Sequence, residues 1–215
     1  MTDPLARAAF AWSVRLISGC GARWIGIDPL HPETGQPVQR VYFANHTSNL
    51  DAPVIWAALP SQLRYNTRPI AAQDYWDKGA VRQFLAKRIL NAVLIERLKV
   101  TRSSHPLVPM EAALATGSSL IIFPEGTRGR NESGELGEFK PGLFHLARKF
   151  PGVQFVPVYL DNLSRILPKG EILLVPILAA ARFGAPVQLG EGEAKTDYLV
   201  RAREALAALG REQTV

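Results

Sequence analysis

Residues 4–18 carry apolar side chains at helical spacing, which predicts an amphipathic helix at the start of the chain. The apolar positions are Leu5, Ala9, Trp12 and Leu16, widened by Phe10, Val14 and Ile17. Arg7 and Arg15 fall toward the other side of this helix. Two interpretations fit the pattern: a helix in a membrane interface with both arginines at the headgroups, or a helix docked on the protein core.

Farther along, short apolar runs alternate with helical patterns. The runs read as strands are 40–44, 68–72, 92–95, 119–123, 153–160, 172–177 and 186–189, and the helical patterns fall at about 52–59, 78–89, 105–116, 141–149 and 196–209. Runs of nearly continuous hydrophobicity are typical of strands that are buried on both faces. The pattern predicts an α/β fold with a largely parallel mixed sheet flanked by helices on both faces. Antiparallel strands fit near the end of the chain.

The length of 215 residues fits a single domain. We expect residues 1–24 to form an N-terminal amphipathic helical appendage, residues 38–190 the α/β core, and residues 191–215 a C-terminal helix. No stretch reaches the roughly 20 apolar residues that a membrane-spanning helix needs. The start also lacks the unbroken apolar stretch of a signal peptide. We therefore expect a cytoplasmic protein that touches a membrane peripherally, from that side.

The positive charge of the chain is concentrated in its first half. Lys and Arg total 25 against 19 Asp and Glu, and residues 1–108 hold 13 of the basic and 7 of the acidic side chains. This excess suits nucleic acid, anionic lipid or a phosphorylated substrate, and it also fits a merely solvated surface. No recognisable DNA-binding helix pair or RNA-stacking motif is present, so nucleic acid is not expected. A single cysteine, Cys20, excludes an intrachain disulfide.

A candidate for general base catalysis follows the run at 40–44. His46 and Asp51 lie five residues apart in the segment that joins this run to the next helical pattern. Histidine suits base catalysis near neutral pH, and a carboxylate on one ring nitrogen selects the tautomer that leaves the other nitrogen free. Ser48, Asn49 and Asp51 are also good N-cap residues, and a histidine before a helix more often caps or packs than acts as a base, so the spacing alone does not establish catalysis.

A candidate anion site follows the run at 119–123, where residues 124–130 include two glycines, a threonine and two arginines. Backbone N–H groups and guanidiniums are natural partners of phosphate. Arg97 follows another run, and Lys140 comes just before a predicted helix, so both add cations at the same sheet edge. The alternative is that Glu125 pairs with an arginine and the glycines only shape a turn. We find no metal-ligand motif and expect no cofactor; His31, His105 and His145 read as structural or exposed.

Four blocks along the chain resemble the motifs of the glycerolipid acyltransferases, the family of lysophosphatidic acid and glycerol-phosphate acyltransferases. Asn-His-x-Ser-x-x-Asp is matched at 45–51, and Phe-Pro-Glu-Gly-Thr-Arg is matched at every position of 123–128. Residues 91–97 correspond to Gly-x-Ile-Phe-Ile-x-Arg, with Asn for Gly and Leu for Phe, and residues 156–159 correspond to Val-Pro-Val with an apolar residue. The stretch 71–74 lacks the basic residue often found there in the family.

The resemblance implies an O-acyltransferase of phospholipid biosynthesis. The chain would move a fatty acyl group from a thioester, on coenzyme A or acyl carrier protein, to a hydroxyl of a lysophospholipid. The acceptor that the resemblance favours is 1-acyl-glycerol-3-phosphate. His46 would be the general base and Asp51 its orienting partner. The substrate-binding residues would be Ser48, Arg97, Glu125, Gly126, Thr127, Arg128 and Lys140, with Pro157 shaping the site near the donor chain.

Two further expectations and two alternatives accompany this resemblance. Backbone N–H groups of the first or third block would stabilise the oxyanion of the reaction. The predicted helix at 78–89 would help to hold the protein on an anionic membrane, because it carries Lys78, Arg82, Lys87 and Arg88 beside Val81, Phe84, Leu85 and Ile89. The alternatives are another acceptor, glycerol 3-phosphate or a lyso-aminolipid, and a non-catalytic lipid-binding protein.

Overall fold

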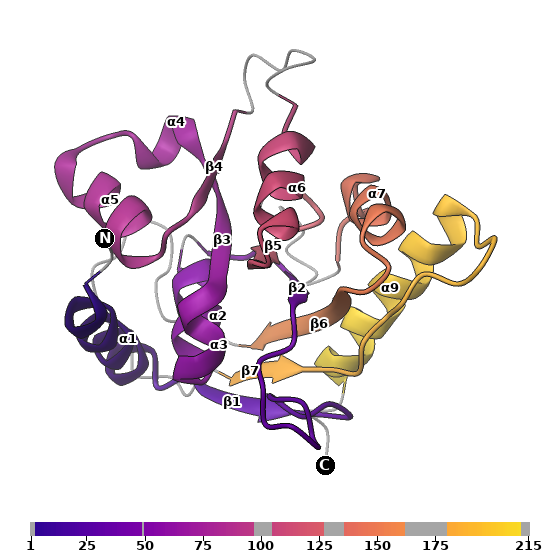
Figure 1. The fold of residues 1–215 in the computed structure, drawn as a ribbon, viewed down its shortest axis with the longest axis horizontal. Coiled ribbons are helices and arrows are strands. Elements are labelled where there is room, and N and C mark those ends of the chain that lie inside the picture. Colours follow the sequence, from indigo (N-terminus) through magenta and orange to yellow (C-terminus); the bar gives the residue numbers. More distant parts are fainter. Residues whose placement is uncertain (1–2, 49, 97–104, 127–135, 162–179, 212–215) are drawn as a thin grey trace.

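A twisted sheet runs through the centre of the computed structural model, which describes residues 3–48, 50–96, 105–126, 136–161 and 180–211 (Figure 1). Its strands are β1 (Gly21–Trp24), β2 (Arg40–Ala44), β3 (Thr67–Ala72), β4 (Val93–Ile95), β5 (Ser119–Ile122), β6 (Gln154–Asp161) and β7 (Ala180–Phe183). Their order across the sheet is β1-β7-β6-β2-β5-β3-β4. Neighbours are parallel except β6 and β7, so the expected mixed, largely parallel sheet is confirmed.

Helices cover both faces of this sheet, as expected. They are α1 (Pro4–Ser18), α2 (Asp51–Ala58), α3 (Ser61–Asn66), α4 (Gln73–Trp76), α5 (Ala80–Phe84), the π-helical segment η1 (Leu85–Ile89), α6 (Leu107–Ala115), α7 (Gly142–Lys149) and α9 (Lys195–Arg211). One hydrophobic core lies between the sheet and α1, α2 and η1. A second core lies between the opposite face and α6, α7 and α9.

Strand β2 lies in the middle of the sheet, between β5 and β6, and all five of its residues are buried. Val41 and Phe43 face one core, whereas Tyr42 and Ala44 face the other. Burial on both faces explains the unbroken apolar run at this position. The segment after β2 therefore begins at the carboxyl edge of the most deeply buried strand, where ligands of open α/β sheets usually bind.

Five of the seven predicted strands are confirmed and one is wrong. The five runs from 40–44 to 153–160 correspond to β2, β3, β4, β5 and β6 within a residue or two. The run at 186–189 is not a strand, because Pro186 lacks an N–H and the segment contributes the single ladder-like bond from Val187 N to Phe155 O (2.7 Å). The run at 172–177 lies outside the described residues.

Residues 21–24 are a strand of the sheet rather than part of a helical appendage. They form β1, which pairs in parallel with β7, and neither strand was predicted. The helix expected at 78–89 is divided into α5 and η1, while α3 and α4 were not anticipated. The helices expected at 52–59, 105–116, 141–149 and 196–209 correspond to α2, α6, α7 and α9.

The arginines of α1 point into the protein, so the interpretation that placed them at lipid headgroups is wrong, and α1 is docked on the protein. Arg7 is buried and donates to the backbone oxygens of Arg64 (3.0 Å) and Tyr65 (3.4 Å). Its guanidinium also lies 5.2 Å from the ring centroid of Trp56. Burial lowers the pKa of Arg7, yet a guanidinium stays charged at neutral pH. Carbonyl dipoles and an aromatic face, rather than phosphates, compensate this charge.

Arg15 binds the carboxyl end of α2. Its guanidinium donates to the backbone oxygens of Ala57 (2.6 Å), Ala58 (3.3 Å) and Leu59 (3.1 Å). The last carbonyls of a helix have no partner within the helix and carry its negative dipole end, so a cation there satisfies both needs. Arg15 therefore joins α1 to α2.

The opposite side of α1 exposes large apolar side chains. Leu5, Trp12 and Leu16 are 80%, 66% and 67% exposed. The helical spacing of these residues was predicted correctly, and they face away from the sheet, whereas the smaller Ala11 packs against it. No helix in the described part of the chain is long and apolar enough to cross a bilayer.

We predict that Arg15→Met lowers the free energy of unfolding by about 1–3 kcal/mol, since it leaves helix-end carbonyls without their charged donor. Denaturant titration followed by circular dichroism measures the change. Arg23→Met, on an exposed position of β1, is the matched control and should stay within about 0.5 kcal/mol of wild type. Equal losses in the two variants would contradict the role of Arg15 at the end of α2.

Candidate active site

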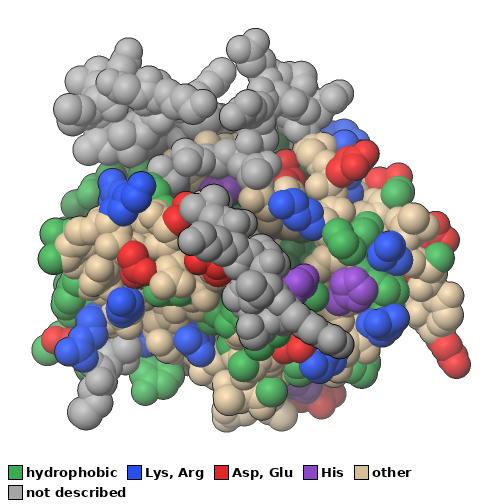
Figure 2. Space-filling view, turned by 90° about the horizontal axis from the view of Figure 1, so that it is seen from above, with side chains coloured by type: hydrophobic (Ala, Val, Ile, Leu, Met, Phe, Trp, Pro, Cys, Tyr) green, Lys and Arg blue, Asp and Glu red, His purple; other side chains and the backbone are tan. Residues whose placement is uncertain are grey.

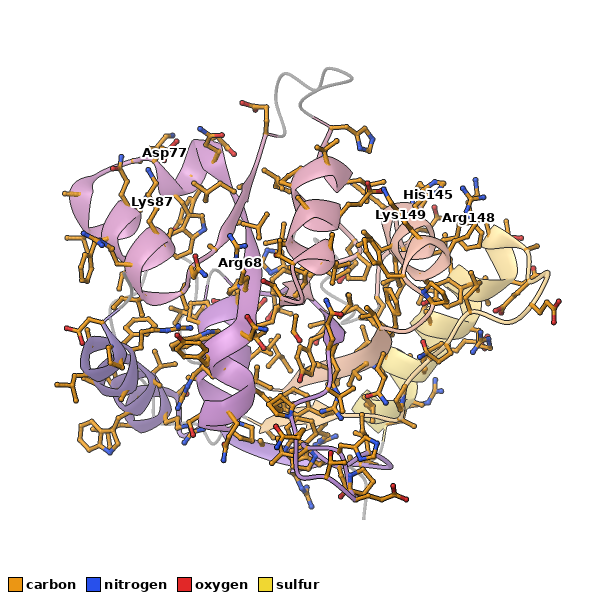
Figure 3. All side chains as sticks on the ribbon, in the orientation of Figure 1. Arg68, Asp77, Lys87, His145, Arg148 and Lys149 are labelled. Atoms are coloured by element: carbon orange, nitrogen blue, oxygen red, sulfur yellow. The ribbon has the colours of Figure 1, made fainter. Side chains whose placement is uncertain are left out.

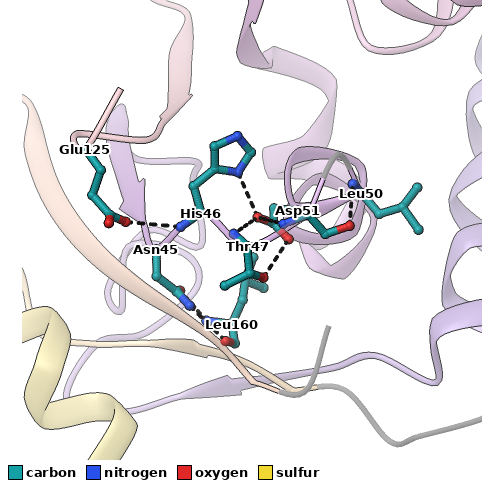
Figure 4. A network of polar contacts seen from close by, with 8 residues as sticks. Asn45, His46, Thr47, Leu50, Asp51, Glu125 and Leu160 are labelled. Atoms are coloured by element: carbon teal, nitrogen blue, oxygen red, sulfur yellow. Dashed lines mark hydrogen bonds and ion pairs between the residues drawn. The ribbon is translucent and has the colours of Figure 1, made fainter. Parts of the chain in front are cut away.

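The loop between β2 and α2 brings the two predicted catalytic side chains together. His46 Nδ1 lies 2.8 Å from Asp51 Oδ2 (Figure 4). The imidazole is 21% exposed and the carboxylate is completely buried. Because the carboxylate occupies Nδ1, the ring carries its proton there in the neutral form and leaves Nε2 as the proton acceptor.

Asp51 organises the loop through its backbone as well. Its Oδ2 also accepts the N–H of Thr47 (2.6 Å) and of Ser48 (2.8 Å), and Oδ1 lies 3.4 Å from Thr47 Oγ1. A fully buried carboxylate requires such partners, because burying a bare charge is very costly. The side chain bonds to residues that precede α2 and does not cap the helix's own N–H groups, so the helix-cap alternative does not describe it.

Two more side chains hold the start of the loop. Asn45 extends the sheet beyond β2, because its amide donates to Leu160 O (3.0 Å) and accepts from Leu160 N (2.8 Å) on β6. Glu125 accepts the N–H of His46 (3.3 Å) with one oxygen and the N–H of Gly137 (2.9 Å) with the other. The backbone of His46 is thus held from β6 on one side and from the segment after β5 on the other.

The ring of His46 stacks on Phe123, which directly follows β5. The two ring centroids are 4.2 Å apart and the planes are inclined by 21°. Both rings line a cavity of about 690 Å³. The stacking follows from the topology, since β2 and β5 are adjacent parallel strands whose carboxyl ends meet at one edge.

The cavity is mainly apolar and lies beside the imidazole. Strand β3, helices α4, α6 and α7, the segment between η1 and β4, and the segment after β5 form most of its described walls. Apolar residues that line it include Ile70, Trp76, Leu90, Met110, Leu143 and Leu146. Its size falls in the usual range of small-molecule sites, about 300–1,000 Å³. A titratable ring at the wall of an apolar cavity is the arrangement expected of a site that acts on an apolar substrate.

Gly126 and Lys140 form the described part of the predicted anion site. Gly126 has φ +71°, and a Cβ at this position would overlap the Lys140 side chain, which crosses it closely. Lys140 N donates to Pro124 O (2.9 Å), and both Gly126 and Lys140 line the cavity. Lys140 therefore carries a cation to the same cavity as His46. Arg97, Thr127 and Arg128 lie outside the described residues.

Three other predicted site residues do not line the cavity. The oxygens of Glu125 are both engaged by backbone N–H groups, so it holds the loop of His46 rather than facing a ligand. Ser48 Oγ accepts the N–H of Leu50 (3.2 Å). Pro157 is buried in β6 opposite Phe43, where its ring abuts Gly184. Their roles toward substrates stay predictions.

The backbone donors expected to stabilise an oxyanion are mostly engaged within the protein. The N–H groups of His46, Thr47 and Ser48 bond to Glu125 or Asp51. The N–H of Gly126 donates to the oxygen of Phe123 (3.0 Å). Among the described residues of the two blocks, these groups are already satisfied, whereas the Lys140 ammonium offers charge at the cavity.

The remaining histidines and the surface charges add little to this site. His31 and His105 each accept a nearby backbone N–H, and His105 also borders the cavity. His145 lies on α7 with Arg148 and Lys149, on the outer side of that helix (Figure 3). Seen from above, the described part of the surface mixes acidic and basic side chains rather than forming one positive field (Figure 2).

Comparison with known proteins agrees with the motifs and the geometry. The profile of the acyltransferase family matches residues 32–161, which include β2 to β6 and the site. The chain belongs to this acyltransferase family. The match covers His46, Asp51, Phe123 and Lys140, so the cavity wall and the candidate base lie within it.

Similar sequences include proteins named as 1-acyl-sn-glycerol-3-phosphate acyltransferases. The chain is 29% identical to the chloroplastic 1-acyl-sn-glycerol-3-phosphate acyltransferase of Arabidopsis thaliana over 68% of this chain and 38% of that protein. It is 28% identical to a probable 1-acyl-sn-glycerol-3-phosphate acyltransferase of Mycoplasma pneumoniae over 60% of this chain and 46% of that protein. The chain thus spans less than half the length of these two relatives.

The fold also has a solved counterpart. The crystal structure of the 1-acyl-sn-glycerophosphate acyltransferase PlsC from Thermotoga maritima superposes with a TM-score of 0.73, covering 99% of this chain and 80% of that one at 20% identity. At this identity the likeness establishes a shared fold, and the expected α/β architecture with an N-terminal helix is confirmed by it.

The sequence predicted the contact between His46 and Asp51 but not the residues that support it. Asn45 and Phe123 belong to the two best-matched blocks. Their spacing did not show that the Asn45 side chain bonds to the backbone of β6, or that the Phe123 ring stacks on the imidazole of His46. The only available signal was that both flank the ends of buried strands. The residues of α4 that line the cavity could not be predicted either, because that short helix itself was not predicted.

Proposed function

We propose that the protein transfers a fatty acyl group from a thioester to the free hydroxyl of a lysophospholipid, with 1-acyl-glycerol-3-phosphate as the acceptor. The observation that carries this proposal is the His46–Asp51 pair at the wall of an apolar cavity. Family membership and relatives named as 1-acyl-sn-glycerol-3-phosphate acyltransferases support the same reaction.

The proposed chemistry is direct transfer without an acyl-enzyme intermediate. Nε2 of His46 takes the proton of the acceptor hydroxyl as its oxygen attacks the thioester carbonyl. Asp51 stabilises the imidazolium that forms. The new ester C–O bond forms, the C–S bond breaks, and the leaving thiolate takes up the proton from His46. No metal or cofactor enters this scheme, and the thioester on coenzyme A or acyl carrier protein is a substrate.

We assign the two ends of the substrates to two parts of the cavity. The apolar walls suit fatty chains, whose burial supplies about 0.8 kcal/mol for each CH₂ group. Lys140, which lies across Gly126 just before the first turn of α7, suits the phosphate of the acceptor. The motif arginines Arg97 and Arg128 remain predicted partners of the same phosphate.

The first prediction concerns the base. His46→Ala should lower thiol release from acyl-CoA and from acyl carrier protein thioester by about 10²–10⁴-fold with lysophosphatidate as the acceptor, because the variant lacks the imidazole that takes the hydroxyl proton. Purified full-length protein is assayed with a thiol reagent. Its far-UV circular dichroism should stay that of wild type.

His145→Gln is the matched control, since His145 lies on α7 and does not line the cavity. Replacing lysophosphatidate by glycerol 3-phosphate, a lyso-aminolipid or monoacylglycerol ranks the acceptors, and lysophosphatidate should give the highest kcat/KM. Near wild-type turnover by His46→Ala would contradict the mechanism. Lipid binding by the wild-type protein without thiol release from either donor would point to a lipid carrier instead.

We further propose that the protein binds an anionic membrane peripherally, on the cytoplasmic side. Large apolar side chains are exposed on α1 (Leu5, Trp12 and Leu16) and on α5, where Val81 and Phe84 are 73% and 52% exposed. Helix α1 packs against η1, and α1 and α5 lie on the same side of the molecule (Figure 1). Such a surface suits partial insertion among acyl chains.

The basic side chains near α5 play a smaller part than their number suggests. Lys87 pairs with Asp77 at 3.7 Å (Figure 3), and the guanidinium of Arg82 lies 4.5 Å from the ring centroid of Tyr75. An exposed ion pair and an exposed cation–π contact are both weak, so Lys87 and Arg82 can still approach anionic headgroups, but each first has to give up a partner within the protein. The apolar side chains should therefore contribute most of the membrane affinity.

The second prediction follows from this surface. The double variant Leu5→Ser, Leu16→Ser should bind vesicles of phosphatidylcholine with about one-third phosphatidylglycerol at least about tenfold more weakly than wild type, because two exposed leucines no longer enter the bilayer. Co-sedimentation measures the partition. Val200→Ser, at a 56% exposed position of α9, is the control and should bind like wild type. Equal binding by all three proteins would reject α1 as the contact.

A further inference from the structure

The imidazole of His46 is restrained by two different groups. Asp51 holds the ring at one atom, Nδ1, at 2.8 Å. Phe123 covers one face of the ring, with centroids 4.2 Å apart and planes inclined by 21°. A single hydrogen bond leaves the ring able to tilt about the bonded atom, whereas a parallel aromatic neighbour limits that tilt. The two contacts together determine where Nε2 points.

We infer that Phe123 is a positioning residue for His46, a role that rests on the proposed acyl transfer. The ring of Phe123 keeps the imidazole plane in the orientation that directs Nε2 toward the acceptor hydroxyl. Positioning of this kind matters because reacting atoms must approach within about 3–3.5 Å along a defined direction. Phe123 itself neither donates nor accepts a proton.

The stack also favours the charged form that the reaction creates. His46 becomes an imidazolium when it takes the hydroxyl proton, and the face of an aromatic ring attracts a nearby cation. Because the imidazolium is formed as the hydroxyl is deprotonated, this attraction is stronger in the transition state than in the ground state. Interactions that strengthen in this way raise kcat rather than lower KM.

The register of the sheet gives Phe123 this position. Phe43 of β2 is opposite Ile122 of β5, so the residues that follow the two strands leave the sheet side by side. Phe123 begins the turn in which Gly126 N bonds to its oxygen, and Glu125 of the same turn holds the backbone N–H of His46. One short segment thus restrains His46 at its ring and at its backbone.

The experiment separates an aromatic role from that of a simple apolar wall. Phe123→Leu keeps an apolar side chain but removes the ring face, and Phe123→Tyr keeps the ring. We expect Phe123→Leu to lower kcat for thiol release by about 3- to 30-fold, with the acceptor KM changed less than about threefold. Phe123→Tyr should retain kcat within about twofold of wild type. Phe150→Leu, at the end of α7 and outside the cavity lining, is the control and should leave kcat unchanged.

A spectroscopic measurement tests the geometry without relying on activity. The chain has four histidines, so the His46 ring protons can be assigned by their loss in His46→Ala. The ring current of Phe123 should move these signals upfield in wild type and in Phe123→Tyr. In Phe123→Leu they should return toward the positions of an unstacked histidine.

Two results would overturn the inference. One is a Phe123→Leu protein whose kcat lies within twofold of wild type while His46→Ala is inactive; the other is His46 ring signals that do not change in Phe123→Leu. If the wild-type protein releases no thiol from any donor, the proposed function fails. The ring signals then decide alone whether Phe123 orients the imidazole.

Discussion

A buried carboxylate is the constraint on which the site depends. Asp51 has no exposed surface, and an ionised group in that position must be compensated by donors from the protein. Its Oδ2 receives three of them: two backbone N–H groups of the preceding loop and Nδ1 of His46. The loop therefore wraps around the carboxylate, and the imidazole is one of the groups that it holds. Removing any one donor would disturb the compensation of the charge as well as the ring.

The position of that carboxylate depends in turn on α2 and its surroundings. Asp51 is the first residue of α2, and Arg15 and Arg64 donate to carbonyls at the other end of the same helix. Burial and repulsion by the neighbouring Arg15 and Arg7 lower the pKa of Arg64. The helix that carries Asp51 at one end is thus bound at its other end to α1, whose outer face is the proposed membrane contact. In the proposed function, the membrane contact and the general base therefore depend on the same pair of helices.

The sequence predicted those parts of the fold whose residue pattern is set by burial alone. Strands buried on both faces, such as β2 and β6, appear as continuous apolar runs, so they were found. Strand β1 has exposed positions and β7 contains Arg182, which is buried through bonds to Leu209 O and Asp161. Neither four-residue strand has the continuous apolar run by which the other strands were recognised. On α1 the helical spacing was predicted correctly, whereas the spacing left the orientation open, because the arginines bind helix-end carbonyls that are distant in sequence.

The candidate site shows the same division. His46 and Asp51 were identified because their chemistry requires those residue types at close range, and a five-residue spacing across a turn allows it. Glu125 was expected beside the phosphate, yet its oxygens bind the backbone at His46 and Gly137, a tertiary contact that no local pattern reveals. Phe123 could be quoted as part of a motif, but its stacking depends on the register between β2 and β5.

The most direct test of the account is the tautomer of His46. Long-range ¹H–¹⁵N correlation spectra of histidine-labelled protein, recorded above neutral pH and assigned with His46→Gln, distinguish the protonated ring nitrogen from the bare one. The account predicts that Nδ1 carries the proton and Nε2 does not, because Asp51 accepts from Nδ1. A neutral ring protonated at Nε2, or one that averages between the two forms, would contradict it.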